Sequence, residues 1–193
     1  MRPGSLPTSL RVNGRDYAID TDFRNVLQIL IALADDKLKD REKAYICMRR
    51  LYEHMEDIPR DDAQAAYDAA ADFITAGMTG DSRAPNVVNW SKDEPLIFPE
   101  INKVAGCEVR ALPYLHWWTF LGYFQAVDRD GIWGTVLTIR QKRAKGKKLE
   151  KYEKEFYKSN KALISMKKEK LKSGKDLLES IFKELSEEEE EDD

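Results

Sequence analysis

Residues that build catalytic and metal sites are scarce in this chain of 193 residues, which contains two His and two Cys. His54 and His116 lack the HExxH spacing of a zinc site, and His116 is expected to be a packing residue inside a helix. The sequence has no GxSxG, GxxxxGKS/T or GxGxxG element, so nothing indicates an activated serine or a phosphate-binding loop. We therefore predict that the protein is not an enzyme and holds neither a metal ion nor a cofactor.

Long apolar runs are also missing. No stretch approaches the roughly 18 apolar residues that cross a bilayer, and the first seven residues lack the apolar centre of a signal peptide. Cys47 and Cys107 do not form a CxxC pair, and each lies among apolar neighbours. This predicts two buried thiols in a reducing compartment. Together these features indicate a soluble, intracellular protein with no membrane partner.

Charge is abundant but unevenly distributed, although the net charge is only −3. Residues 140–175 contain 15 Lys and Arg against 4 Asp and Glu, whereas residues 176–193 contain 10 acids against a single Lys. Adjacent like charges repel each other and bury no apolar surface, so we expect residues 186–193 to be a disordered acidic tail.

The N-terminal half predicts a β-hairpin followed by helices. Asn13 and Gly14 lie between alternating apolar positions and suit the positive φ angles of a two-residue turn, which places a hairpin at residues 9–19. Asp20 or Thr21 can cap the next helix, whose apolar face extends to about residue 34. Two further helices are predicted over residues 40–56 and 59–77.

Residues 77–94 are predicted to form a loop because Gly, Ser, Asn and Pro are frequent there. This loop contains three apolar residues, Val87, Val88 and Trp90. Either these residues pin the loop onto the body, or they form a docking element for a partner. A fourth helix is expected to begin at Pro95 or Pro99 and to end near Gly106.

The aromatic residues are concentrated in the segment Leu112-Pro-Tyr-Leu-His-Trp-Trp-Thr-Phe-Leu-Gly-Tyr-Phe124. We predict one helix here, from Pro113 to about Val127, because proline suits the first helical turn. Such a helix is apolar on nearly all sides, so its own protein or a partner must bury it. Either its rings form the core of a helical domain, or one edge stays open as a groove for an amphipathic helix.

A further helix is expected to begin near Ile132, and its pattern allows continuation past Gly146 into a long charged arm. The arm carries a heptad-like apolar stripe that makes self-association plausible, formed by Leu149, Tyr152, Phe156, Leu163 and Met166. The sequence therefore predicts a mainly α-helical protein. Its parts are a helical body with an N-terminal hairpin, a charged helical arm that ends in an amphipathic helix, and the acidic tail, at residues 1–139, 140–185 and 186–193.

Two parts of the chain resemble one phage family. The first is LHWWTFLGYF at 115–124 followed by IWGTVLTIRQKR at 132–143, and the second is LPTSLRVNGRDYAIDTDFRNVLQI at 6–29. Both resemble the "gene product fifteen" family of siphophages and prophages of Gram-positive bacteria, over about residues 6–160. That family usually has a Tyr-Gly-Ile-Asp-Leu-like element before the aromatic helix, where this chain has Val104-Ala-Gly-Cys-Glu-Val-Arg110, so the local turn can differ.

The resemblance implies a tail assembly chaperone, because family members are generally encoded between the major tail protein and the tape measure protein. Such a chaperone binds and solubilises the tape measure protein in the host bacterial cytoplasm and helps to recruit major tail protein subunits. The aromatic groove would shield tape measure helices, and the arm from Ile139 onward would meet tail subunits or a second copy. The candidate partner-binding residues are Trp117, Trp118, Phe120, Phe124, Trp133, Arg140, Tyr152 and Phe156.

Two other functions fit parts of the sequence. One is a minor structural component that remains in the mature tail. The other is a nucleic-acid-binding protein that uses residues 140–175 to contact phosphates. The later lysines alternate with Glu150, Glu153 and Glu155, however, which is typical of a solvated helix with short-range ion pairs. No recognised nucleic-acid-binding motif accompanies the basic run, so nucleic acid is not the expected partner.

Overall fold

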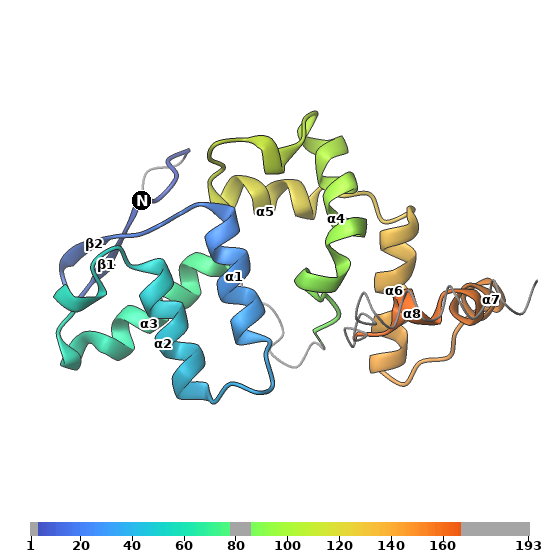
Figure 1. Ribbon diagram of the computed structural model, residues 1–193, viewed down its shortest axis with the longest axis horizontal. Coiled ribbons are helices and arrows are strands. Elements are labelled where there is room, and N and C mark those ends of the chain that lie inside the picture. Colours follow the sequence, from blue (N-terminus) through green and yellow to red (C-terminus); the bar gives the residue numbers. More distant parts are fainter. Residues whose placement is uncertain (1–3, 78–85, 167–193) are drawn as a thin grey trace, which may run out of the picture.

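The computed structural model describes residues 4–77 and 86–166, which form a mainly α-helical protein with a small N-terminal β-hairpin (Figure 1). This confirms the predicted fold class. The elements are β1 (Ser9–Val12), β2 (Arg15–Ala18), α1 (Phe23–Leu33), α2 (Asp40–Leu51), α3 (Ala63–Ile74), α4 (Trp90–Ala105), α5 (Trp117–Gln125), α6 (Ile132–Ala144), α7 (Lys151–Ser159) and α8 (Lys161–Ile164). Short 3-10 turns are η1 (Met55–Asp57), η2 (Arg60–Asp62) and η3 (Val109–Ala111).

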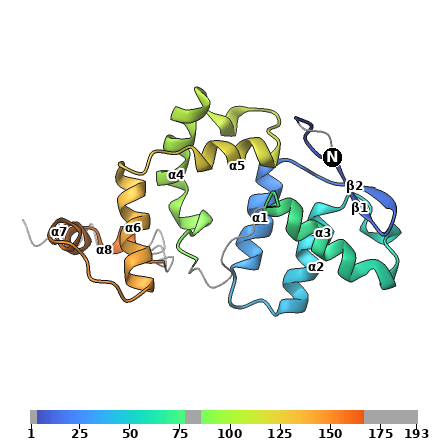
Figure 2. The ribbon, with the colours of Figure 1, turned by 180° about the vertical axis from the view of Figure 1, so that it is seen from behind.

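Three groups of elements follow one another along the long axis of the molecule (Figures 1 and 2). The hairpin and helices α1 to α3 occupy one end, α4 and α5 the middle, and α6 to α8 the other end. Helix α1 packs against both α4 and α5, and α4 also contacts α6. Helix α4 therefore joins the N-terminal group to the C-terminal one.

The predicted hairpin is confirmed. Asn13 and Gly14 form its turn with φ angles of 46° and 91°, which is the backbone that such a turn requires. The strands pair antiparallel with Val12 opposite Arg15. A two-stranded hairpin is marginal alone, and here β1 packs against α3.

Helix α1 is capped by Asp22, and not by Asp20 or Thr21 as predicted. The Oδ1 atom of Asp22 accepts a hydrogen bond of 2.9 Å from the backbone N–H of Arg24, which satisfies a free donor of the first turn. Its Oδ2 atom accepts another, of 3.3 Å, from the backbone N–H of Leu115. The cap therefore also fixes the segment that precedes α5.

Helix α2 ends at Leu51, five residues before the predicted end. Tyr52 leaves the helix in an extended conformation and forms an isolated β-bridge with Ile19. Its buried hydroxyl donates a 2.8 Å hydrogen bond to the carbonyl of Ala66 in α3. Helix α3 ends before Gly77, whose φ of 69° confirms the predicted glycine stop.

Helix α4 begins at Trp90, so the predicted start at Pro95 or Pro99 is wrong. Asn89 caps the helix through its side-chain oxygen, which accepts from a backbone N–H three residues later. The two prolines lie one turn apart inside the helix and are exposed, so the carbonyls that lose their N–H partners can face water. The predicted end is confirmed, because Gly106 adopts the left-handed conformation at φ 71°.

The apolar residues before α4 pin the chain onto the body, as one of the two interpretations predicted. Val87 is buried, Val88 is partly buried, and the ring of Trp90 lies 5.0 Å from that of Phe124. Residues 78–85 of the predicted loop lie outside the described residues.

Helix α5 begins at Trp117, four residues later than predicted, because His116 acts as its cap. The Nδ1 atom of His116 accepts a 3.0 Å hydrogen bond from the backbone N–H of Trp118. Its Nε2 atom lies 3.0 Å from the carbonyl oxygen of Pro7, to which it donates when Nδ1 is the acceptor. His116 is buried and satisfied at both ring nitrogens, so it organises the start of α5 and the N-terminal segment.

The C-terminal segment folds back instead of continuing as one helix. Helix α6 ends at Ala144, before Gly146, and both α7 and α8 pack against it. The boundary predicted between residues 139 and 140 thus falls within α6. The predicted helix at 178–185 and the acidic tail at 186–193 lie outside the described residues.

The aromatic core lies between α1, α4 and α5. Phe23 and Phe120 stack with ring centroids 4.5 Å apart. Trp117 stacks on the same Phe120 ring at 5.8 Å, and Phe98 tilts against it at 5.9 Å. Such aromatic pairs add stability beyond the apolar area that they bury.

Candidate functional site: a buried arginine cluster and an apolar groove

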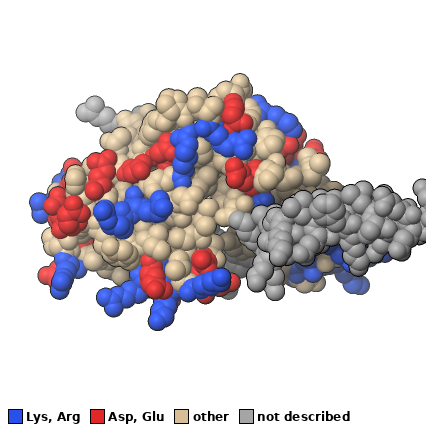
Figure 3. Space-filling model, in the orientation of Figure 1, with Lys and Arg blue, Asp and Glu red and all other residues tan. Residues whose placement is uncertain are grey.

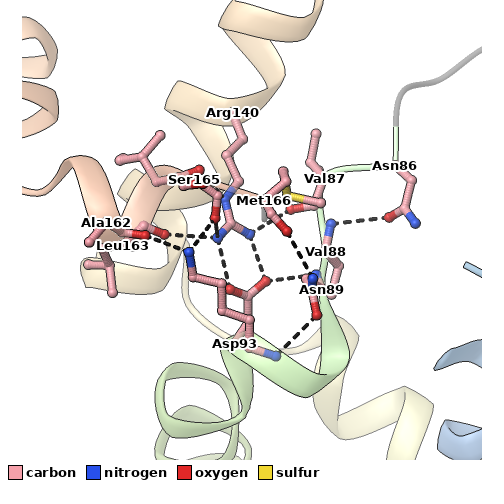
Figure 4. Close-up of polar contacts among 12 residues, drawn as sticks. Asn86, Val87, Val88, Asn89, Asp93, Arg140, Ala162, Leu163, Ser165 and Met166 are labelled. Atoms are coloured by element: carbon pink, nitrogen blue, oxygen red, sulfur yellow. Dashed lines mark hydrogen bonds and ion pairs between the residues drawn. The ribbon is translucent and has the colours of Figure 1, made fainter. Parts of the chain in front are cut away.

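Arg140 stands at the junction of α4, α6 and α8 (Figure 4). Only 4% of Arg140 and 1% of Asp93 are exposed to solvent. The guanidinium grips the carboxylate with two hydrogen bonds, from Nη1 to Oδ2 at 2.6 Å and from Nη2 to Oδ1 at 2.8 Å. This parallel, charge-assisted geometry is the strongest form of an arginine–carboxylate pair.

Backbone carbonyls satisfy the remaining donors of Arg140. Its Nε atom donates to Ile164 at 3.0 Å, and Nη1 donates to Val87 at 2.9 Å. Its Nη2 atom donates to Leu163 at 2.9 Å. One buried side chain thus fixes both the segment before α4 and the end of α8, and we call Arg140, Asp93 and these carbonyl partners the arginine cluster.

The first turn of α4 strengthens the same junction. The backbone N–H of Asn89 donates to Asp93 Oδ2 at 2.8 Å, and its side-chain amide donates to the carbonyl of Met166 at 2.9 Å. The ammonium of Lys92 donates to the carbonyls of Ala162 and Ser165 at 2.6 and 2.7 Å. Asn89, which caps α4, and Lys92 in the first turn of α4 therefore also hold α8 and the two residues that follow it in place.

A second charged link joins α7 to α6. The ammonium of Lys142 lies 2.6 Å from Oε1 of Glu153, whose side chain is 1% exposed. Burial alone would raise the pKa of Glu153, but hydrogen bonds from Lys142 and from the backbone of Glu150 outweigh it, so the pKa is lowered. The hydrogen bond to Glu153 raises the pKa of Lys142. Both groups are thus charged and paired near neutral pH.

Four of the predicted partner-binding residues lie in the interior. Trp117, Phe120 and Trp133 are at most 2% exposed, and Arg140 belongs to the arginine cluster. The indole N–H of Trp117 donates to the carbonyl of Ile74 at 2.8 Å. A partner cannot reach these side chains in this fold, so the interpretation of these rings as a helical core is the one that the structure supports.

The other four predicted residues keep some exposed surface but do not form one site. Trp118 and Phe124 are partly buried on α5, whereas Tyr152 is 62% exposed and Phe156 is partly buried on α7. The indole of Trp118 also donates to the carbonyl of Phe73 at 2.9 Å and stacks on its ring. Partner contact stays a prediction for these four residues.

An apolar groove of about 470 Å³ lies elsewhere, between α1 and α4. Its apolar lining consists of Phe23, Leu27, Ile31, Trp90 and Phe98. Charged and polar side chains from both helices and from η3 form its rim, namely Arg24, Gln28, Glu94 and Arg110. We call this feature the α1–α4 groove, and sequence periodicity did not single it out because its two walls are far apart in the chain.

Two arginines at the rim of the groove are held in place. The guanidinium of Arg24 lies 4.6 Å from the centre of the Phe23 ring, and that of Arg110 lies 4.9 Å from the Phe98 ring. Arg110 also pairs with Glu108 and Glu94 at 2.8 and 3.3 Å. Hydrogen bonds from Arg110 lower the pKa of Glu108 to about 2. Arg24 likewise pairs with Asp22 at 2.9 Å. Carboxylates therefore neutralise both guanidinium groups, and the rim offers hydrogen-bonding groups rather than net positive charge beside apolar surface.

Several residues of this architecture were not predicted from the sequence. Asp93 and Asn89 fell within the predicted loop, although Asn is among the preferred residues at a helix start. The prediction of two buried thiols is wrong for one of them. Cys47 is buried, but Cys107 is exposed after the glycine that ends α4, because the helix stops before the cysteine can enter the core.

Within residues 4–77 and 86–166, no group of three or more His, Cys, Asp and Glu side chains is placed to hold a metal ion. In the same ranges, no helix is both long and apolar enough to cross a bilayer. The prediction of a protein without catalytic activity stays a prediction.

Fold and site together define a helical protein whose buried charges hold its own elements together. The chain belongs to the family described as Bacteriophage Gp15 protein, which matches residues 4–166. Both segments that carry the resemblance lie in this range, so the predicted family is confirmed and the chain is a bacteriophage protein. No curated protein and no solved structure matches it.

Proposed function

We propose that this protein is a tail assembly chaperone that binds the phage tape measure protein and keeps it soluble in the host cytoplasm. Membership of the Bacteriophage Gp15 protein family is the observation that carries the proposal, because the resemblance to this family implies that role. A tape measure protein is a long helical chain with apolar stripes that stay exposed until the tail tube encloses it. Its chaperone needs a surface that covers an amphipathic helix reversibly.

The α1–α4 groove is the surface that we assign to this helix. Ile31 and Trp90 are partly exposed there and offer apolar contact, as a helix-binding groove does. The guanidinium groups of Arg24 and Arg110 lie at its edge, where each side chain is 40–45% exposed. A bound helix would direct its apolar stripe into the groove and its polar residues toward the two arginines.

Co-expression with the tape measure protein tests both parts of this proposal. Gln28 lies exposed on the groove rim, so Gln28→Arg should fill the groove without disturbing the core. Gln64→Arg is the matched control, because Gln64 is exposed on α3 and bonds only to Asp68 in the described structure. Wild type and Gln64→Arg should keep the tape measure protein in the supernatant, and Gln28→Arg should not.

The outcomes separate the function from its location. If wild type leaves the tape measure protein insoluble, the chaperone proposal is wrong. If all three proteins rescue it equally, the function holds but the groove is not the site. Circular dichroism and thermal unfolding of each variant show whether the fold is kept.

Recruitment of major tail protein subunits is the second part of the proposal. Tyr152 and Phe156 on α7 are the side chains that we assign to this contact, since Tyr152 is largely exposed. A minor tail component is the competing function. Quantitative mass spectrometry of purified particles distinguishes them, because a chaperone should be absent or far below one copy per tail, whereas a structural component should be present in fixed stoichiometry.

A further inference from the structure

The C-terminal elements present a basic surface with few acidic neighbours. Its eight side chains come from the end of α6, the connection to α7, and helices α7 and α8, and all are exposed: Arg143, Lys145, Lys147, Lys148, Lys151, Lys154, Lys158 and Lys161. We call these eight residues the basic surface. Figure 3 shows blue atoms at the lower right, beside the grey residues, in the region that α6 to α8 occupy in Figure 1.

Acidic groups of the same elements leave this charge largely uncompensated. Glu153 is buried and already paired with Lys142, so only Glu150 and Glu155 among residues 141–166 add exposed negative charge. Within the described ranges, none of the eight basic side chains forms an ion pair. Such a surface attracts anionic polymers.

The sequence supplies a matching anion. Residues 187–193 are seven consecutive Glu and Asp. We propose that this acidic segment binds the basic surface of its own chain and shields it from nucleic acid. This inference does not depend on the chaperone function.

The connection between the two segments is long enough for this contact. The carbonyl of Met166 is fixed by the side-chain amide of Asn89, five residues after Lys161 of the basic surface. Twenty-one positions separate residues 166 and 187, and a random coil of that length would span about 25 Å on average. Helix α7, with nine residues, is only about 14 Å long, so the acidic segment can reach every part of the surface.

Covalent linkage also decides which anion occupies the surface. A tethered segment competes at an effective concentration in the millimolar range. It weakens nucleic-acid binding by a factor of one plus this concentration divided by the Kd of the segment for the surface. A Kd of about 10⁻⁴ M, at the weak end of non-specific charge contacts, gives a factor of about ten. Salt should weaken the contact, because exposed charges are screened beyond about 10 Å at 0.1 M salt.

Carbodiimide cross-linking of the full chain tests the contact directly, since it joins a carboxylate to an amine that it touches. Mass spectrometry of the monomer band should show links from residues 187–193 to lysines such as Lys147, Lys148 and Lys151, and high salt should abolish them. Links found only in a dimer band would mean that a second copy is the occupant and would overturn the proposal. Absence of any link to the basic surface would overturn it as well.

Binding to a short fluorescent DNA duplex tests the shielding. At low salt, a chain that ends at Ser186 should bind about tenfold more tightly than the full chain. A full-length control in which every acid of 187–193 is replaced by its amide should behave like the truncated chain, because it lacks charge and not length. Adding Lys147→Gln and Lys148→Gln to the truncated chain should weaken binding again. Equal affinity of the full and truncated chains would refute the shielding role.

Discussion

Replacing Arg140 by methionine would keep most of the apolar stem but remove the guanidinium that Asp93 faces. Asp93 is 1% exposed, so Arg140→Met leaves a carboxylate in the interior without its charged partner. Removing one member of a buried pair costs about 3–5 kcal/mol. The carbonyls of Ile164, Val87 and Leu163 would lose their donors as well, which places the expected cost toward the upper end of that range.

Thermal unfolding measures this cost. For a chain of this size each kcal/mol lowers Tm by about 2–4 °C, so Arg140→Met should lower Tm by about 10 °C or more. Chymotrypsin should also cleave faster near Tyr157, because the cluster holds α8 and the chain end onto α4 and α6. Arg143→Met is the matched control: Arg143 is exposed and stacks over the Tyr157 ring at 4.5 Å, and its loss should cost about 1 kcal/mol or less.

A double variant shows whether the unpaired charge of Asp93 causes the loss of stability in Arg140→Met. Arg140→Met combined with Asp93→Leu leaves no buried charge without a partner, so it should be more stable than Arg140→Met alone. If Arg140→Met unfolds within a few degrees of wild type and is cleaved no faster, the arginine cluster does not hold the C-terminal group. Equal stability of the single and double variants would show that packing, and not charge, explains the loss.

Three further predictions concern other parts of the fold. Gly134→Ala should lower the free energy of unfolding by about 2–4 kcal/mol, because the new Cβ would lie 1.8 Å from the carbonyl oxygen of Arg129. Gly122→Ala has open space around it and should instead raise this free energy by up to about 1 kcal/mol. Urea denaturation of both variants measures the difference. A thiol reagent should modify one cysteine, Cys107, in the folded protein, since burial raises the pKa of Cys47 to about 11; prompt reaction of two thiols would contradict the fold. Folding lowers the pKa of Glu153. The ionised carboxylate therefore stabilises the fold at pH values above the ordinary pKa, and this stabilisation is lost as the pH falls through the lowered pKa. The Tm difference between wild type and Glu153→Gln should be largest near pH 7 and shrink below about pH 4. A Tm difference that does not change with pH would contradict this prediction.

Local signals in the sequence predicted the elements that depend on local chemistry. The Asn13-Gly14 turn fixed the hairpin, and Gly77 and Gly106 marked helix ends that the structure confirms. The start of α4 differs from the prediction because Pro95 and Pro99 lie inside the helix and not at its beginning. Proline strongly favours a helix start, but at exposed positions the body of a helix also tolerates it when packing on the other side compensates.

The arginine cluster shows what the sequence could not reveal. The sequence pointed to Arg140, but it predicted a contact with a partner and not a buried ion pair within the chain. Its carboxylate lies 47 residues earlier in the chain, and no periodic pattern connects residues at that separation. The sequence left open whether the aromatic helix is core or groove for a similar reason. Helices α1 and α4 cover Phe120 from two sides, which a count of apolar positions on α5 alone does not show.

Hydroxyl-radical footprinting of the protein bound to the tape measure protein shows whether the α1–α4 groove holds this partner. We expect oxidation of Trp90 in the groove to fall on binding, whereas Tyr45, which is 58% exposed on α2, should be oxidised equally in both states. The Gln28→Arg variant should show no such protection. If a complex forms and Trp90 is oxidised as fast as in the free protein, the tape measure protein binds elsewhere; if no complex forms, this protein is not its chaperone.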